Sequence, residues 1–480
     1  MPRELITVQV GQAGNQIGSR FWELALKEHA AYNSDGLFDE AMSSFFRNVD
    51  SRHDPPRDLP VRPDKLLPIV DLKARAVVVD MEEGVVNSML KGPLGELFDS
   101  QQLLTDVGGS GNNWAHGHSL YGPQYAASLA DLVRAQAEAC DSLQGFMLLH
   151  SLGGGTGSGL GSFILEQLED DYPTVHRFAT SVFPSHDDDV VTSPYNALLS
   201  LSRLSRHADC AFPLENQALL DICSAVEAKG RRGLTRAGSA VTGADAKSAK
   251  PYDAMNGIAA NMLLNLTSSA RFEGPLNVDL NEISMNLVPY PRQHFLLSSM
   301  SPLAAPKDMG KLVAGPRAMD QVFSDVFQNS YQLIDAEPRQ HTYLACALLM
   351  RGNITAGDFS RVIGRIKSQI TMAPWNADGF KTGICSRAPV GVPFSLLALA
   401  NNCAVGGTFE AMQQRFMQLY RKRLYVHHYT EYMEQQGFEE ALETVAQLAE
   451  DYRILDDVRR PPPLERFFPT GGGFGQNSFR

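Results

Sequence analysis

The hydrophobic and polar positions in the first half of the chain alternate between strand-like and helix-like patterns. Strands are predicted at 5–10, 76–79, 146–149 and 178–183. The second and third of these are continuous apolar runs, which are typical of buried parallel strands. Apolar residues at helical spacing follow the first and third. Strands that alternate with helices predict an open parallel α/β sheet, which binds its ligand at the carboxyl ends of the strands.

The second half of the chain predicts a different organisation. Helical spacing predicts one long helix over 258–270 and two further helices over 409–420 and 438–452. Between them, apolar segments near 283–299 and 342–350 predict the strands of a mixed α/β domain.

Three segments predict loops or disorder. Residues 51–68 include five prolines and are expected to form an exposed loop. Residues 227–250, rich in Gly, Ala, Ser, Lys and Arg, predict a flexible surface insertion. The end of the chain, after Arg459, is rich first in proline and then in glycine, which predicts an unstructured tail.

The most informative polar segment is GGGTGSG at 153–159, between a predicted strand and a predicted helix. Glycines without Cβ atoms allow several backbone N–H groups to converge on one anion. A helix that starts after such a loop also points its N-terminus at the anion. The segment therefore predicts a phosphate site, in which Thr156 and Ser158 add hydroxyls for a metal-bound phosphate. A flexible glycine turn is the alternative.

Spacing argues against two common nucleotide enzymes. The glycine segment contains no G-x-G-x-x-G in any register, which disfavours a dinucleotide enzyme. The chain also lacks G-x-x-x-x-G-K-[ST], so the phosphate lysine of Walker-type enzymes is absent.

Composition indicates the general class of protein to which this chain belongs. The 480 residues carry a net charge of −12, which argues against general nucleic-acid binding. Six scattered cysteines with no C-x-x-C pair indicate reduced thiols in a cytoplasmic protein. The first residues lack the apolar core of a signal peptide, and no apolar run is long enough to span a membrane. We expect a soluble intracellular protein.

Taken together, the polar segments resemble those of the tubulin family. GQxGNQ at 11–16, SGNNWAxGH at 110–118, the glycine segment, SPYN at 193–196 and LNxDLxExxxNLVPYP at 276–291 occur in the family's order. The resemblance covers about 4–456, and SFFRNVD, DMEEGVVN and NLTSSARFEG most resemble the epsilon class of the family.

This resemblance implies an α/β fold with a Rossmann-like parallel-sheet GTPase domain, a central helix, a mixed α/β intermediate domain and a C-terminal helical hairpin. The expected division is a nucleotide-binding domain at 1–226, the flexible insertion at 227–250, a core helix at 251–273, the intermediate domain at 274–400, C-terminal helices at 401–457 and a disordered tail at 458–480.

The resemblance also implies which residues bind GTP or GDP. For the phosphates and nearby groups these are Gln12, Asn112, Ser151, Gly153, Gly154, Gly155, Thr156, Gly157, Ser158 and Gly159. For the base, Tyr252 would stack on guanine, while Asn256 and Asn216 would read its edge. From the residues alone, core packing is the alternative for Tyr252.

Glu82, with Asp80 beside it, is implied in the Mg²⁺ shell, since Mg²⁺ takes one or two carboxylates plus phosphate oxygens. N-capping of the next helix is the alternative for Glu82. Ser193 replaces the family's usual acidic residue near the ribose. The aspartates at 187–189, represented by Asp189, are expected to substitute for it; a solvated turn is the alternative.

Catalysis is implied in trans. Asp279 and Glu282 match the family's loop that completes the GTP site of the next subunit in a head-to-tail filament. Glu282 would orient or deprotonate the attacking water. We therefore expect GTPase activity only on longitudinal assembly. A helix N-terminal acid that interacts with the helix dipole is the alternative.

The role implied is that of a cytoskeletal protein of centrioles and basal bodies, within the centrosome, that acts in doublet and triplet microtubule assembly. Its partners would be other tubulin subunits, especially of the delta class, and centriolar proteins, with no nucleic acid or membrane. A poorly matching lateral segment at 302–316 and a tail without a glutamate-rich end leave open a GTP-dependent centriolar adaptor that never enters the lattice. A metabolic dinucleotide enzyme is the remote third alternative.

Overall fold

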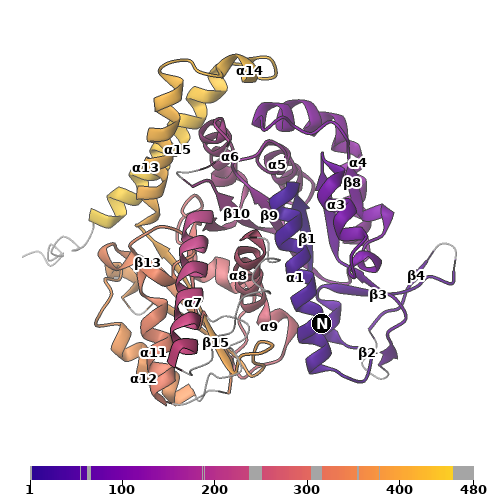
Figure 1. Cartoon of the computed structure of the whole chain (residues 1–480), viewed down its shortest axis with the longest axis vertical. Coiled ribbons are helices and arrows are strands. Elements are labelled where there is room, and N and C mark those ends of the chain that lie inside the picture. Colours follow the sequence, from indigo (N-terminus) through magenta and orange to yellow (C-terminus); the bar gives the residue numbers. More distant parts are fainter. Residues whose placement is uncertain are drawn as a thin grey trace, which may run out of the picture.

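The computed structural model describes residues 3–53, 56–61, 66–185, 188, 190–236, 251–303, 316–353, 356–377 and 379–457. The expected tail and most of the expected lateral segment lie outside these residues. Figure 1 shows an N-terminal α/β domain, a second α/β domain and long C-terminal helices. Among the described residues, no helix combines the length and the apolar composition that a membrane span needs, and none of the six cysteines forms a disulfide.

The N-terminal domain is built on a six-stranded sheet of order β11-β10-β9-β1-β7-β8, in which every neighbouring pair is parallel. Its strands are β1 (Glu4–Val10), β7 (Ala76–Asp80), β8 (Leu103–Thr105), β9 (Leu143–Ser151), β10 (His176–Phe183) and β11 (Cys210–Glu215). The chain passes from β1 to β7 and β8 and then returns to β9 on the other side of β1. Strand order reverses at β1, which opens a crevice at the carboxyl ends there.

Helices cover this sheet, as Figure 1 shows. They are α1 (Gly11–Tyr32), α3 (Glu83–Leu90), α4 (Gly122–Glu138), α5 (Gly161–Asp171) and α6 (Ser193–His207). The GQxGNQ segment at 11–16 lies at the start of α1, because the positive φ of Gly11 (+72°) lets the chain turn directly from strand to helix. Part of the glycine segment, Thr156–Leu160, is likewise a π-helical turn that leads into α5.

The smaller elements of this domain follow α1 in sequence. They are β2 (Leu37–Phe38), α2 (Glu40–Ser43), β3 (Phe46–Asp50), β4 (Arg57–Asp58), β5 (Leu67–Pro68) and β6 (Leu72–Ala74). The expected loop at 51–68 therefore includes two short strands, β4 and β5, which pair with β3 and β2.

Central helices join the two domains. They are α7 (Asn216–Arg236), α8 (Pro251–Leu266) and α9 (Ser268–Arg271). The expectation of an insertion without structure from residue 227 is wrong for its first ten residues, because α7 continues to Arg236; Ala, Glu, Lys and Arg in this stretch favour helix. Residues 237–250 lie outside the described part of the chain. The predicted helix over 258–270 is divided at Thr267 into α8 and α9.

The second domain has a mixed four-stranded sheet of order β12-β15-β13-β14. Its elements are α10 (Leu280–Leu287), β12 (Leu296–Ser301), α11 (Pro316–Val326), β13 (Tyr343–Gly352), α12 (Ala356–Ile366), β14 (Phe380–Cys385) and β15 (Phe394–Asn402). The strand predicted near 283–299 is wrong in its first part, which is helix α10, because Asp279 caps a helical turn there.

The C-terminal helices are α13 (Val405–Tyr420), α14 (Val426–Thr430) and α15 (Gln436–Asp457). The two predicted long helices are confirmed, and α14 is an additional short turn between them. The ring centroid of Tyr195 on α6 lies 5.3 Å from that of Phe416 and 5.3 Å from that of Phe438, so the helical hairpin packs on α6 of the N-terminal domain.

A buried ionic cluster joins α1 to the central helices and the second domain. Glu28 Oε1 accepts a hydrogen bond from Arg351 Nη1 (2.9 Å), and Glu28 Oε2 lies 2.7 Å from Arg271 Nη1. All three side chains are at most 4 % exposed. Two guanidinium groups therefore share one carboxylate where three parts of the fold meet.

His29, beside this cluster, predicts a pH dependence of stability. Burial, and then the charges of Arg271 and Arg351, lower the pKa of His29 from 6.5 to about 3. The unfolded chain binds a proton near pH 6.5 that the folded state resists, so stability is complete above pH 6.5 and falls as the pH decreases toward 3. Between pH 6.5 and 5 this histidine is expected to remove about 2 kcal/mol of the unfolding free energy.

The measurement is urea unfolding of the wild-type chain and His29→Phe at pH 7 and pH 5. The variant keeps an aromatic ring between Phe46 and Phe272 but has no proton to take up. Its stability should fall less on acidification, and equal falls in the two proteins would contradict the assignment.

Candidate nucleotide-binding site

A cavity of about 420 Å³ lies at the carboxyl ends of β1, β7, β9 and β10. The structure brings together there most of the residues singled out from the sequence, namely Gln12, Asp80, Glu82, Asn112, Ser151, Gly153, Gly154, Gly155, Thr156, Gly157, Asn216, Tyr252 and Asn256. Ser158 and Gly159 do not line it, because both are buried behind the loop. Asp189 lies outside the described residues.

The turn after β1 and the glycine segment approach each other very closely. A Cβ atom on Gly11 would lie 2.9 Å from the backbone nitrogen of Gly157, and one on Gly157 would lie 2.9 Å from Ser151 Oγ. The amide of Gly157 and the N-terminus of α1 are therefore neighbours at the cavity. Backbone N–H groups and a helix N-terminus that converge in this way form an anion site.

Gly11→Ala is expected to lower nucleotide affinity at least about tenfold. The side chain would strain a residue at φ +72° and press on the Gly157 amide that faces the cavity. The measurement is titration with a fluorescent GTP analogue. Gly84→Ala on α3 is the matched control, since a Cβ there meets nothing within 4 Å, and its affinity should be that of wild type. Wild-type affinity in Gly11→Ala would contradict the anion-site assignment.

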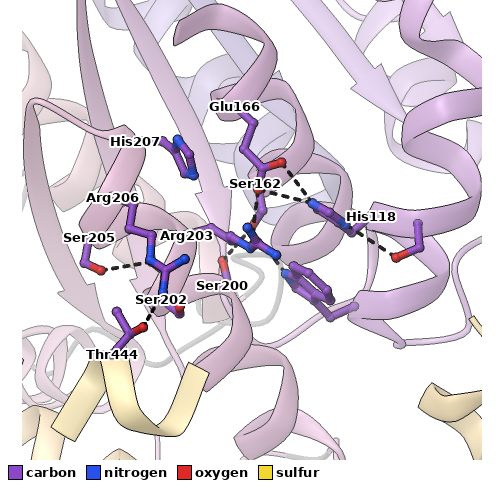
Figure 2. Close-up of polar contacts among 12 residues, drawn as sticks. His118, Ser162, Glu166, Ser200, Ser202, Arg203, Ser205, Arg206, His207 and Thr444 are labelled. Atoms are coloured by element: carbon purple, nitrogen blue, oxygen red, sulfur yellow. Dashed lines mark hydrogen bonds and ion pairs between the residues drawn. The ribbon is translucent and has the colours of Figure 1, made fainter. Parts of the chain in front are cut away.

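Hydrogen bonds hold the glycine segment from behind. Ser162 Oγ donates to the Ser158 carbonyl (2.7 Å) and accepts from Trp114 Nε1 (3.2 Å). The Trp114 indole stacks on His118, whose Nε2 lies 3.2 Å from Glu166, as Figure 2 shows for the His118–Glu166 contact. The Ser158 hydroxyl itself donates to the Gly154 carbonyl. Ser158 therefore positions the loop, and its hydroxyl is not directed at a phosphate as expected.

His150 supports the same loop. Its Nδ1 lies 2.9 Å from the Gly157 carbonyl and its Nε2 lies 2.8 Å from Ser181 Oγ. Burial lowers the pKa of His150 to about 4, so the ring is neutral at pH 7 and fixes the loop without adding charge to the site.

Two carboxylates stand at the end of β7. Burial raises the pKa of Asp80 to about 6, although hydrogen bonds from the Glu82 amide (3.3 Å) and Asn15 Nδ2 (3.5 Å) act in the opposite direction. Glu82 is exposed and occupies the N-cap position of α3, but its side chain makes no capping hydrogen bond. Both carboxylates line the cavity and remain available to a cation.

These carboxylates fit Mg²⁺, which binds through one or two carboxylates together with phosphate oxygens and water. Within the described ranges no group of three or more His, Cys, Asp and Glu side chains is placed to hold a metal ion. Asp80, at the end of β7, and Glu82, before α3, would therefore contribute to the metal shell only alongside a bound phosphate.

The other end of the cavity is aromatic and rich in amides. Asn216 begins α7, while Tyr252 and Asn256 lie one turn apart near the start of α8. The Tyr252 ring is 56 % exposed, so it is a free stacking surface and not the core residue that the sequence alone would favour. Asn256 Nδ2 is 3.5 Å from Gln16 Oε1, a weak contact that a base could displace.

Ser110 lines the cavity although it was not singled out from the sequence, and Asp188 represents the aspartate cluster that was. Ser110 Oγ lies 2.8 Å from Thr156 Oγ1 and ties the polar loop at 110–113 to the glycine segment. Asp188 lines the cavity and accepts a hydrogen bond from Ser193 Oγ (2.8 Å). A carboxylate thus stands beside the serine that replaces the family's acid, as the substitution hypothesis requires. The SGNN and SPYN motifs were the available signals.

Asp279 and Glu282 lie elsewhere and are not part of the cavity lining. Asp279 is the N-cap of α10, and its carboxylate accepts from the Glu282 amide (2.8 Å). Asp279 therefore acts as a helix cap. Glu282 is 43 % exposed and pairs with Lys381 Nζ at 2.6 Å. The cavity lining extends along α8 only as far as Ala259, whereas α10 begins at Leu280, after α8 and α9 have ended.

Comparison with known proteins agrees with this architecture. Residues 4–224 match the Tubulin/FtsZ family, GTPase domain, and residues 291–414 match the Tubulin C-terminal domain. The chain is 51% identical to the Tubulin epsilon chain of Homo sapiens and to that of Mus musculus, over 95% of this chain and 97% of theirs. It is 35% identical to the Tubulin alpha-3 chain of Saccharomyces cerevisiae, over 94% of this chain and 97% of that one.

These matches span both domains and the cavity, which is lined by the N-terminal domain and the central helices. They confirm the family resemblance found in the motifs, and the higher identity to the epsilon chains agrees with the segments that indicated that class. The chain therefore belongs to the tubulin family of GTP-binding cytoskeletal proteins.

Proposed function

We propose that this chain binds GTP or GDP with Mg²⁺ in the cavity at the sheet's carboxyl edge. The glycine segment and the start of α1 hold the phosphates, and Asp80 with Glu82 contributes to the Mg²⁺ shell. Tyr252 stacks on guanine while Asn216 and Asn256 contact its edge. The observation that carries this proposal is the convergence of these separate segments on one cavity of about 420 Å³.

The second part of the proposal concerns hydrolysis. Glu282 is exposed and lies outside the cavity lining, so any nucleotide that it serves belongs to another molecule. We assign Glu282 the role of orienting or deprotonating the attacking water in the next subunit of a head-to-tail assembly. Asp279 caps α10 and thereby fixes the backbone of Glu282, which makes it a positioning residue.

Within the cell, the proposed role is in centrioles and basal bodies, where the chain would act in doublet and triplet microtubule assembly with other tubulin subunits, including the delta class. Similarity to the epsilon chains supports this assignment. One observation favours an adaptor outside the lattice instead. Lys381 Nζ lies 2.6 Å from the Glu282 carboxylate, so this carboxylate already forms an ion pair within its own chain.

The test is to identify the nucleotide retained by the purified chain and to measure its sedimentation with and without a delta-class subunit. Guanine nucleotide and a co-sedimenting assembly are expected. Labelled chain that decorates centrioles without requiring Glu282 would favour the adaptor. A chain that retains no nucleotide, or binds ATP as tightly as GTP, would contradict the site assignment.

Tyr252→Ala is expected to lower GTP affinity about tenfold or more, because the stacking of a base on an aromatic side chain contributes about 1–3 kcal/mol. Asn256→Ala should reduce the preference for GTP over ATP, since it removes a group that contacts the base edge. Competition titrations measure both effects. Tyr290→Ala is the control, because that ring is also exposed but does not line the cavity.

A further inference from the structure

Asn196 on α6 is completely buried, and its side chain uses every hydrogen-bonding position it has. Its Nδ2 donates to the carbonyls of Asn112 and Gly153, both at 2.8 Å. Its Oδ1 accepts from the Trp114 amide (2.9 Å) and from the Tyr429 hydroxyl (2.6 Å). One side chain therefore holds both loops of the nucleotide cavity and a tyrosine of α14.

Other hydrogen bonds connect the same parts of the molecule, namely the cavity loops, α6 and the region of α14. Asn113 Nδ2 donates to the His428 carbonyl (2.8 Å), and Tyr195 OH donates to the Leu424 carbonyl (2.7 Å). The Thr192 hydroxyl donates to the Asn112 carbonyl (3.2 Å). The segment 423–429, between α13 and the end of α14, is thus attached to the loop at 110–113 and to the first turn of α6.

Backbone strain occurs both in the cavity loop at 110–113 and in segment 423–429, the two regions that these hydrogen bonds connect. In the described part of the chain, positive φ occurs at three residues other than glycine: Asn112 (53°), Arg423 (52°) and Tyr425 (59°). Asn112 lines the cavity, whereas the other two lie in segment 423–429. Strained residues persist only where the surroundings hold them, and such strain gathers at switch regions.

The distal end of the connection is exposed. Leu424 and Tyr425 are 41 % and 40 % exposed, and His427 and His428 are exposed as well. A second cavity, of about 460 Å³, lies between this segment and the loop at 108–113, and it shares Ser110, Gly111 and Asn112 with the nucleotide cavity. Segment 423–429 therefore has space beside it in which to change conformation. The three residues common to both cavities connect such a change to the nucleotide cavity.

We propose that Asn196 is a positioning residue that couples nucleotide occupancy to the conformation of segment 423–429. Phosphate binding orders the loops that carry Asn112 and Gly153, and their carbonyls fix the Asn196 amide, whose oxygen then holds the Tyr429 hydroxyl. The exposed segment 423–429 is thereby ordered when nucleotide binds. The coupling is reciprocal, so releasing Tyr429 must weaken nucleotide binding. This inference rests on the proposed binding of nucleotide in the 420 Å³ cavity.

The test is hydrogen exchange of residues 423–430 with and without a non-hydrolysable GTP analogue, alongside a titration of its affinity. Wild type should exchange more slowly in this segment when the analogue is bound. Tyr429→Phe removes only the hydroxyl and leaves the Asn196 contacts to both loops. It should lose most of that protection and bind the analogue about three- to tenfold more weakly.

Two further variants separate the explanations. Asn196→Asp has nearly the same shape but cannot donate to either loop, so it should lose both affinity and protection. Tyr420→Phe makes the same chemical change at a hydroxyl that contacts Gln435 instead of the network, and it should behave as wild type. If Asn196→Asp fails to fold, the result for Tyr429→Phe still decides whether the coupling exists.

Full nucleotide-dependent protection in Tyr429→Phe would overturn the coupling, as would its absence in a wild-type chain that binds the analogue. A wild-type chain that binds no analogue would instead contradict the proposed nucleotide site.

Discussion

Glu282→Ala is expected to slow GTP hydrolysis in a head-to-tail assembly by about 10²- to 10⁴-fold, the usual contribution of a general base. Affinity for GTP should stay unchanged, because Glu282 does not line the cavity of its own chain. The measurement is single-turnover phosphate release in sedimented assemblies of this chain with one fixed partner subunit. The affected nucleotide should be the partner's, since Glu282 lies outside the cavity of its own chain.

Two more variants define the role of the carboxylate. Glu282→Gln keeps the size of the side chain but is a far weaker base, so it should be nearly as slow as alanine. Lys381→Met removes the ion pair at 2.6 Å while retaining the carboxylate, and hydrolysis should persist. If Glu282→Ala also loses nucleotide binding, the residue is structural, and the capping turn of α10 explains its presence.

Glu28→Gln is expected to lower the free energy of unfolding by about 3–5 kcal/mol, the range found when one partner of a buried ion pair is removed. The neutral amide would leave two guanidinium groups, each at most 1 % exposed, without a counter-charge. Burial disfavours ionisation of Glu28, but Arg271 and Arg351 outweigh it and hold the carboxyl pKa below its usual value. The measurement is urea unfolding at pH 7.

Glu23→Gln on the same helix is the matched control. Glu23 pairs with Arg20 and Lys27 at the surface, where such pairs contribute at most about 1 kcal/mol. If the two variants lost a similar amount of unfolding free energy, the buried cluster would stabilise the fold no more than the surface pairs do. Because Arg351 belongs to β13 and Arg271 to α9, loss of the cluster should also reduce the cooperativity between the domains.

Much of the fold was predictable because its signals are local. The continuous apolar run at 76–79 corresponds to β7, and the helical spacing at 438–452 corresponds to α15. The segment near 283–299 was misread because a short apolar run is compatible with both strand and helix. What decides it is the Asp279 carboxylate bonded to the Glu282 amide, a contact that apolar spacing does not reveal.

In the candidate site, too, some features were predictable from local sequence and others were not. Glycine content indicated an anion loop, since close backbone approach requires glycine whatever the rest of the fold. Sequence could not distinguish Thr156 from Ser158, although both carry hydroxyls in the same segment. In the structure Thr156 lines the cavity, whereas Ser158 turns back to the Gly154 carbonyl. The two residues belong to one π-helical turn, in which side chains two positions apart point to nearly opposite sides.

Local sequence patterns were sufficient to identify the family and the parallel sheet and to predict a phosphate loop, because each depends on residues close together in the chain. Packing was needed to bring Asp80, Tyr252 and the glycine segment to one cavity, whose lining does not include Glu282. It also joined Asn196 to Tyr429, 233 residues later. Such contacts depend on how helices and strands pack, and packing geometry is not encoded in any local pattern.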